Sequence, residues 1–86
     1  MRESITQGRI RAFLINSGYY VVKLINTSKP GIPDLMAIKD GKVIFFEVKS
    51  AKGQTSKLQD YQMEQLREYG AEAYVVRGVD EVKALI

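Results

Sequence analysis

The sequence predicts an α/β fold in which a small mixed β-sheet is flanked by helices. Two observations support this prediction. Apolar periodicity and turn residues divide the chain into the order helix, three strands, helix, strand, helix, or αβββαβα. A helix between the third and fourth strands implies a right-handed crossover, which places the fourth strand parallel to the third. Helices can then cover both faces of the sheet.

Length and composition limit the class of protein. With 86 residues, of which 45% are hydrophobic, we expect residues 1–86 to form a single domain with its own core. There is no cysteine, so no disulfide stabilises the fold, which agrees with a reducing cytoplasm. The sequence has neither a membrane-spanning apolar run nor a signal peptide. We therefore expect a cytoplasmic protein of a bacterial or phage-infected host cell.

The charge is uneven along the chain. Residues 1–57 contain ten Lys and Arg but only four Asp and Glu, whereas residues 58–86 contain three and six. A basic N-terminal part suits a phosphate backbone as partner. Ordinary surface charge is the alternative interpretation, and charge alone favours it.

The first half of the chain predicts a helix, a strand and a loop. Residues 4–16 have apolar side chains at helical spacing, namely Ile5, Ile10, Phe13 and Leu14, and Gly18 is the expected C′ residue. Residues 19–25 are rich in β-formers and predict the first strand. Residues 26–33 predict a loop.

The second half predicts a helix, a strand and a short helix. Thr55 or Ser56 is expected to cap the second helix, which runs to about Tyr69 and buries Leu58, Tyr61 or Gln62, Leu66 and Tyr69. Residues 71–76 predict the fourth strand. Asp80 is expected to cap a final helix that ends at residue 86.

Residues 31–49 predict a β-hairpin with charged groups at its open end. Asp40-Gly41 is a strong signal for a two-residue turn. If these residues form the loop, Asp34 lies directly opposite Glu47, and Lys49 lies on the same face because side chains alternate along a strand. A register shift of one residue would move Glu47 and Lys49 to the other face.

The hairpin strands are apolar on both faces, so we expect both faces to be covered. An acid in such a strand is costly without a strong partner. Glu47 is therefore either a structural acid paired with Lys49 or a functional group, and its cost favours function.

Two adjacent carboxylates repel unless a cation separates them. Lys49 could supply that cation, and so could Mg²⁺, which one or two carboxylates and water commonly hold. The chain has no His and no Cys. This argues against a typical zinc site and excludes Ser-His and Cys-His nucleophiles.

Pro33-Asp34 followed by Glu47-Val48-Lys49 resembles the PD-(D/E)xK signature of a nuclease superfamily. The fuller pattern resembles the VRR-NUC (virus-type replication-repair nuclease) family over nearly all 86 residues. It comprises Gly31-Ile32-Pro33-Asp34-Leu35, Phe46-Glu47-Val48-Lys49, Gln59 in a helix, Gly70, and Val75-Val76-Arg77 at a strand end.

This resemblance implies a PD-(D/E)xK restriction-endonuclease-like core and assigns roles to residues. Asp34, Glu47 and the backbone carbonyl of Val48 would bind Mg²⁺ or Mn²⁺. Lys49 would orient or deprotonate the attacking water, or neutralise the scissile phosphate. Gln59 would support the site, its alternative being a solvated amide.

Glu3, the acid available in the first helix, would also help to build the site. The alternative for Glu3 is an acid that simply stabilises a helix N-terminus.

The sequence thus predicts a Mg²⁺- or Mn²⁺-dependent endonuclease that hydrolyses phosphodiester bonds of branched DNA such as four-way (Holliday) junctions. Two alternatives stay open. The chain could be a non-catalytic nucleic-acid-binding module with the same fold, or a small interaction protein. A symmetric homodimer is also expected, because resolving a junction requires two coordinated cuts and the chain is rich in tyrosine.

Overall fold

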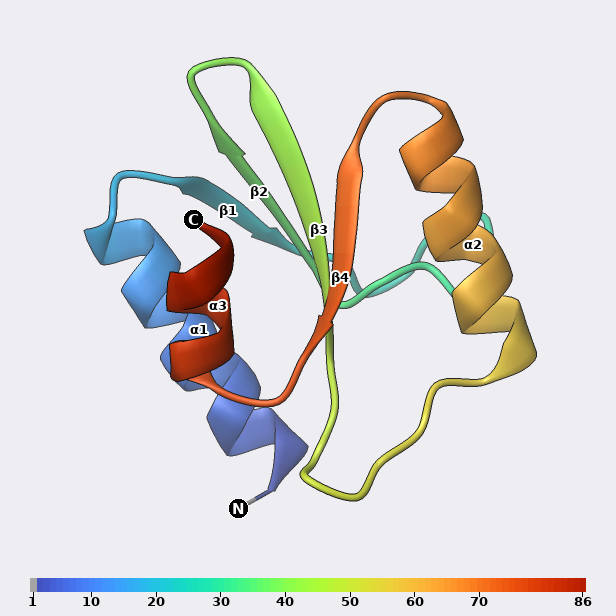
Figure 1. Cartoon of the computed structure of the whole chain (residues 1–86), viewed down its shortest axis with the longest axis horizontal. Coiled ribbons are helices and arrows are strands. Elements are labelled where there is room, and N and C mark those ends of the chain that lie inside the picture. Colours follow the sequence, from blue (N-terminus) through green and yellow to red (C-terminus); the bar gives the residue numbers. More distant parts are fainter. Residues whose placement is uncertain (1) are drawn as a thin grey trace.

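The computed structural model describes residues 2–86 and has the predicted element order (Figure 1). The helices and strands are α1 (Glu3–Asn16), β1 (Tyr20–Lys23), β2 (Leu35–Lys39), β3 (Lys42–Val48), α2 (Lys57–Glu68), β4 (Glu72–Val76) and α3 (Val79–Leu85). Figure 1 shows α1 and α3 on one side of the sheet and α2 on the other. No helix among the described residues is both long and apolar enough to cross a membrane.

The sheet is mixed, as predicted. Its strand order is β1-β2-β3-β4, with the first two pairings antiparallel and the last parallel. The β2–β3 register pairs Lys39 with Lys42 and Leu35 with Phe46, so the two-residue turn is confirmed. Asp40 and Gly41 both have positive φ, at 52° and 79°, as a type I′ hairpin turn requires.

One face of the sheet carries the core, and we call it the inner face. Side chains of β2, β3 and β4 pack there against α1 and α3 in a fully buried cluster of Ile10, Leu14, Leu35, Ala37, Ile44, Phe46, Val48, Val76 and Val82. Of the apolar residues at helical spacing in this helix, Ile5 lies outside the core, because its side chain is 47% exposed and Thr6 is buried in its place. Thr6 lies four residues before Ile10, on the same side of the helix, whereas Ile5 is turned away.

The opposite face, here called the outer face, is only half covered. α2 packs mainly against β4, so the outer side chains of β2 and the start of β3 stay half-buried, namely Met36, Ile38, Val43 and Phe45. Helices thus lie on both faces of the sheet, as expected, but the cover of the outer face is only partial. The crossover places α2 against β4, which is an edge strand of the sheet, so β1 and β2 lie outside its main contact.

The buried side of α2 agrees with the prediction only in part. Of the predicted residues, Gln62 is buried and Leu66 is half-buried, whereas Leu58, Tyr61 and Tyr69 are 43%, 57% and 89% exposed. Met63, which was not predicted, is also buried. Because α2 touches the sheet along one edge only, a narrow side of the helix is enough to make the contact.

The ends of the helices show local chemistry. Gly18 follows the C-cap of α1 with φ of 90°, as predicted. Ser56 caps α2 and settles the choice between Thr55 and Ser56. The N-cap of α3 is Gly78, not Asp80, because the helix begins earlier and the Glu81 carboxylate accepts from the backbone N–H of Arg77.

Candidate active site

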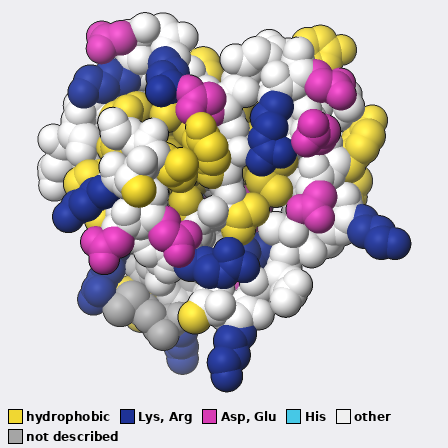
Figure 2. Space-filling model, viewed as in Figure 1, with side chains coloured by type: hydrophobic (Ala, Val, Ile, Leu, Met, Phe, Trp, Pro, Cys, Tyr) yellow, Lys and Arg dark blue, Asp and Glu magenta, His cyan; other side chains and the backbone are white. Residues whose placement is uncertain are grey.

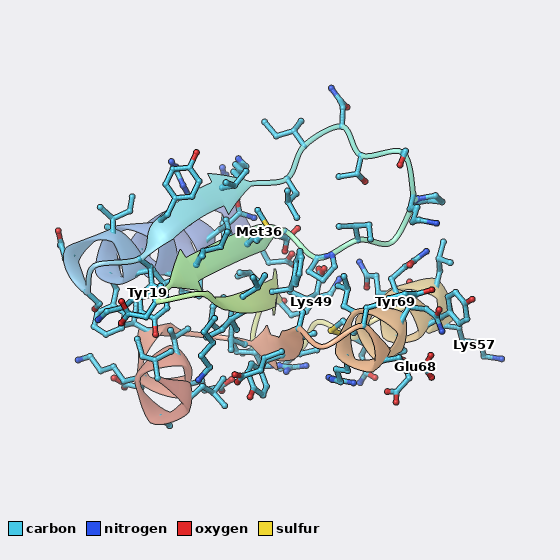
Figure 3. All side chains as sticks on the ribbon, turned by 90° about the horizontal axis from the view of Figure 1, so that it is seen from above. Tyr19, Met36, Lys49, Lys57, Glu68 and Tyr69 are labelled. Atoms are coloured by element: carbon cyan, nitrogen blue, oxygen red, sulfur yellow. The ribbon has the colours of Figure 1, made fainter. Side chains whose placement is uncertain are left out.

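Four of the residues singled out from the sequence meet at one end of the outer face. Asp34 directly precedes β2, Glu47 lies near the end of β3, and Lys49 follows β3. Since Leu35 pairs with Phe46, the next residues along, Asp34 and Glu47, face each other across the two strands. The predicted register is thus confirmed. Figure 3 labels Lys49 between the strand ends and α2.

Direct contacts link these groups. The backbone N–H of Val48 donates to Asp34 Oδ2 at 2.8 Å, which fixes that carboxylate against the end of β3. Glu47 Oε2 lies 3.6 Å from Lys49 Nζ and 3.4 Å from Gln59 Nε2. One carboxylate oxygen of Glu47 therefore receives both a cation and an amide donor.

The helix cap directs Gln59 towards the site. Its backbone N–H donates to Ser56 Oγ at 3.1 Å, and its side-chain Oε1 accepts from the Ser56 N–H at 2.9 Å, which completes a capping box. With Oε1 engaged in the cap, Nε2 is left to donate to Glu47. The first turn of α2 and the acidic pair are thereby joined through one side chain.

Glu47 is placed against its solvation preference. The residue is only 3% exposed. Burial, together with repulsion from Asp34, raises the pKa of Glu47 to about 7, although the neighbouring Lys49 lowers it in part. A carboxyl group with a perturbed pKa beside a second carboxylate is typical of functional sites.

The site fits a hard divalent cation. Asp34 and Glu47 offer carboxylate oxygens from facing strand positions, and their mutual repulsion is what a bound cation would relieve. Mg²⁺ commonly takes one or two carboxylates and completes its shell with water and substrate oxygens. No cluster of three or more acidic residues suited to a metal occurs within residues 2–86, so any further ligands would come from the backbone, water or substrate.

Glu3 is not brought into this group. It is the first residue of α1, is exposed, and lies in no acidic cluster of the described residues. Its position in the first turn of α1 suits an acid at a helix N-terminus.

The loop that delivers Asp34 is fixed to α2 by contacts that the sequence did not reveal. Gln62 Nε2 donates to the Pro30 carbonyl oxygen at 3.3 Å. Gly31 has φ of 84°, and a Cβ there would lie 2.8 Å from the Leu58 side chain and 3.1 Å from its backbone oxygen. The only signals in the sequence were Gly31 in the motif and a polar residue at a buried helix position.

Exposed basic side chains occur on segments near this end of the sheet. Figure 2 shows several Lys and Arg at its lower edge, where Figure 1 places the N-terminal end of α1 and the loop after β3. Arg2, Arg9, Lys52 and Arg77 are exposed residues of these segments and of the end of β4. Arg9 and Arg77 also line a common cavity of about 450 Å³, together with Asp80 and Glu81. Exposed cations on these segments suit a phosphate-rich ligand.

Comparison with known proteins gives a consistent result. The model of the archaeal Holliday junction resolvase (Hjc) family matches residues 6–83. No curated protein sequence matches the chain.

Solved structures with the same fold carry related names. A "VRR_NUC domain" has a TM-score of 0.84 and 28% identity, over 96% of this chain and 91% of that one. A "VRR_NUC domain protein" has a TM-score of 0.69 and 19% identity, over 93% and 84%. The Holliday junction resolvase Hjc of Archaeoglobus fulgidus has a TM-score of 0.70 and 23% identity, over 87% and 67%.

Proposed function

Because the chain belongs to the Hjc family, within the PD-(D/E)xK nucleases that include the VRR-NUC domains, we propose that it is a divalent-metal-dependent endonuclease of branched DNA. The observation that carries this proposal is the convergence of Asp34, Glu47 and Lys49 at one end of the sheet. A four-way junction is the favoured substrate, since the matching family consists of junction resolvases.

Each residue has a part in the proposed mechanism. Asp34 and Glu47 would hold Mg²⁺ or Mn²⁺, with the Val48 carbonyl as a further ligand. The bound metal would polarise a phosphoryl oxygen and lower the pKa of water. Lys49 would orient or deprotonate the attacking water, or neutralise charge on the scissile phosphate. Its side chain is 14% exposed, and its Nζ lies 3.6 Å from Glu47 Oε2, which supports this role.

Gln59 would keep Glu47 in position for the metal. Its amide joins the α2 cap to the Glu47 carboxylate, so a shift of the helix would move the ligand. Gln59→Ala is therefore expected to weaken metal binding more than DNA binding, whereas Asp34→Ala removes a ligand outright.

A cleavage assay tests the proposed function. Linear, flap and four-way junction substrates of equal length would be incubated with Mg²⁺, Mn²⁺ or EDTA. We expect metal-dependent incision with preference for the junction, and none in EDTA. Salt-sensitive binding without incision would favour a non-catalytic DNA-binding module. Absence of salt-sensitive binding would favour an interaction protein.

We also propose that the working unit is a symmetric homodimer. Exposed and half-buried apolar side chains form two cross-strand rows on the uncovered part of the outer face, here called the outer patch: Tyr20, Val22, Met36, Ile38, Val43 and Phe45. Exposed apolar patches often mark interfaces, and a two-fold axis would supply two matching active sites. Not all of the tyrosines expected at an interface are exposed. Tyr19 and Tyr74 pack against the core, whereas Tyr20 is 69% exposed.

Sedimentation of matched variants tests the dimer. Tyr20→Glu places a charge in the outer patch, and Tyr69→Glu places one on a more exposed tyrosine of the α2 end. We expect wild type and Tyr69→Glu to sediment as dimers and Tyr20→Glu as a monomer. A wild-type mass near 9.7 kDa that persists with junction DNA present would contradict the dimer. If Tyr69→Glu alone dissociates the dimer, the interface lies at α2 and not at the outer patch.

A further inference from the structure

Arg77 connects two segments that flank the candidate active site. It is the first residue after β4, and its Nη2 donates to the Gly53 carbonyl oxygen at 2.7 Å. Gly53 belongs to the loop that joins β3 to α2 and so leads from Lys49 to Gln59. Within residues 2–86, this is the one hydrogen bond that the guanidinium group makes.

The loop that Arg77 holds lies directly on Lys49. The Gly53 N–H donates to the Ser50 carbonyl oxygen at 3.0 Å and closes a tight turn. A Cβ on Gly53 would lie 3.0 Å from Ser50 Oγ and 3.5 Å from Lys49 Cβ. The turn therefore packs close to the Cβ of Lys49.

Backbone hydrogen bonds hold Arg77 and its neighbour Val76 in place. Its backbone N–H donates to Glu81 Oε1 in the first turn of α3, at 3.0 Å. The preceding residue, Val76, accepts the backbone N–H of Lys49 at 3.0 Å. The ends of β3 and β4 are thus fixed to each other, and Arg77 extends from that junction to the turn.

We propose that Arg77 is a positioning residue, which holds the turn of residues 50–53 against Lys49 and so fixes the lysine beside Glu47. The inference rests on the proposed nuclease function, in which Lys49 acts on water or the scissile phosphate. A displacement of about 1 Å in a reacting group can lower a rate about 10²-fold. Loss of the Arg77 contact frees this turn to move by such a distance.

Arg77→Lys tests the proposal, because lysine keeps the positive charge but lacks the planar fork that meets the carbonyl oxygen. Arg67→Lys is the matched control, since Arg67 donates to the Ala73 carbonyl oxygen at 2.7 and 3.1 Å, away from the site. Single-turnover cleavage of a four-way junction would be measured with Mg²⁺, and the junction Kd would be measured separately in EDTA.

We expect Arg77→Lys to cleave about 10-fold to 100-fold more slowly, with the junction Kd and its salt dependence unchanged. Arg67→Lys should cleave at the wild-type rate. Gly53→Ala disturbs the same turn from the other side and should give the same split between rate and affinity. The two changes combined should cost less than the product of their separate effects, because both act through the position of the same turn.

Several outcomes would overturn the proposal. A folded Arg77→Lys protein with the wild-type rate would do so while leaving the nuclease function intact. Weaker binding by a neutral Arg77→Gln variant, with a salt slope smaller by about one and cleavage at saturation unchanged, would make Arg77 a phosphate contact instead. Absence of metal-dependent cleavage by wild type and Arg67→Lys alike would overturn the proposed function, and this inference with it.

Discussion

The two faces of β3 carry consecutive residues with opposite tasks. Phe46 lies on the inner face, fully buried among aliphatic side chains of α1 and α3. Glu47 lies on the outer face, almost as buried at 3% exposure, but beside a second acid. The backbone that places one side chain in the core places the next at the candidate site, because side chains alternate along a strand.

This comparison separates stability from chemistry within one strand. On the inner face, each buried apolar side chain adds to the free energy of unfolding. On the outer face, desolvation and the repulsion between Asp34 and Glu47 raise the pKa of Glu47 to about 7. Proteins tolerate such unfavourable placements chiefly where function requires them. Four substitution or pH experiments test this difference between the two faces.

The largest expected effect is loss of cleavage in Asp34→Ala and Glu47→Ala. Each variant should cleave at least about 10³-fold more slowly and bind metal more weakly, while remaining folded. Asp34→Ala also leaves the Val48 N–H without its acceptor, at a cost of about 1 kcal/mol. Junction cleavage and calorimetric Mn²⁺ titration would measure these effects. Wild-type nicking by Glu47→Ala at matched metal concentration would refute the assignment.

Lys49→Ala should separate catalysis from metal binding. Cleavage should fall to background, while metal still binds, because the carboxylates remain. Lys49 lowers the pKa of Glu47, so its removal should also shift the pH midpoint of metal binding upwards. Mn²⁺ titrations from pH 6 to 8 would show the shift. A Lys49→Ala protein with unchanged cleavage would remove the lysine from the mechanism.

The sequence predicted the inner face and the acidic site well because both depend on local signals. The Asp40-Gly41 turn determines the register, and the register alone brings Asp34 opposite Glu47. The capping box at Ser56 also follows from a short pattern, and it orients Gln59.

The remaining features depend on how elements pack in space. The extent of outer-face coverage follows from where the crossover places α2, which no residue pattern encodes. The contacts of Gln62 with Pro30 and of Arg77 with Gly53 join segments that are 32 and 24 residues apart. Glu3 illustrates the limit of a resemblance, since a first-turn acid has a local stabilising role whether or not it reaches the site.

Substitution of the adjacent phenylalanines should show the same contrast in stability. Phe46→Ala removes a fully buried ring that packs near Tyr74, with centroids 6.3 Å apart, and should cost about 3–5 kcal/mol. Phe45→Ala removes a half-buried ring of the outer patch and should cost less, about 1–2 kcal/mol. Urea unfolding would measure both. Equal costs would mean that the outer face contributes to the core as much as the inner face does.

The last expected effect is a pH dependence of stability that Glu47 imposes on the metal-free protein. Its pKa rises from 4.5 to about 7 on folding. A group with a raised folded pKa contributes stability below its unfolded pKa and loses it as pH rises through the folded value. The metal-free protein should therefore lose up to about 3 kcal/mol between pH 4.5 and about 7, at about 1.4 kcal/mol per pKa unit.

Glu47→Gln isolates this effect from the other titrating groups. The variant cannot ionise at position 47, so its stability in EDTA should exceed that of wild type increasingly as pH rises from 5 to 8. Mg²⁺ should reduce the difference, because a bound cation stabilises the ionised carboxylate of wild type. Urea unfolding at each pH would measure both trends. Parallel stability curves for the two proteins in EDTA would show that Glu47 ionises as easily in the folded chain as in the unfolded one, and the contrast between the two faces would then be one of packing alone.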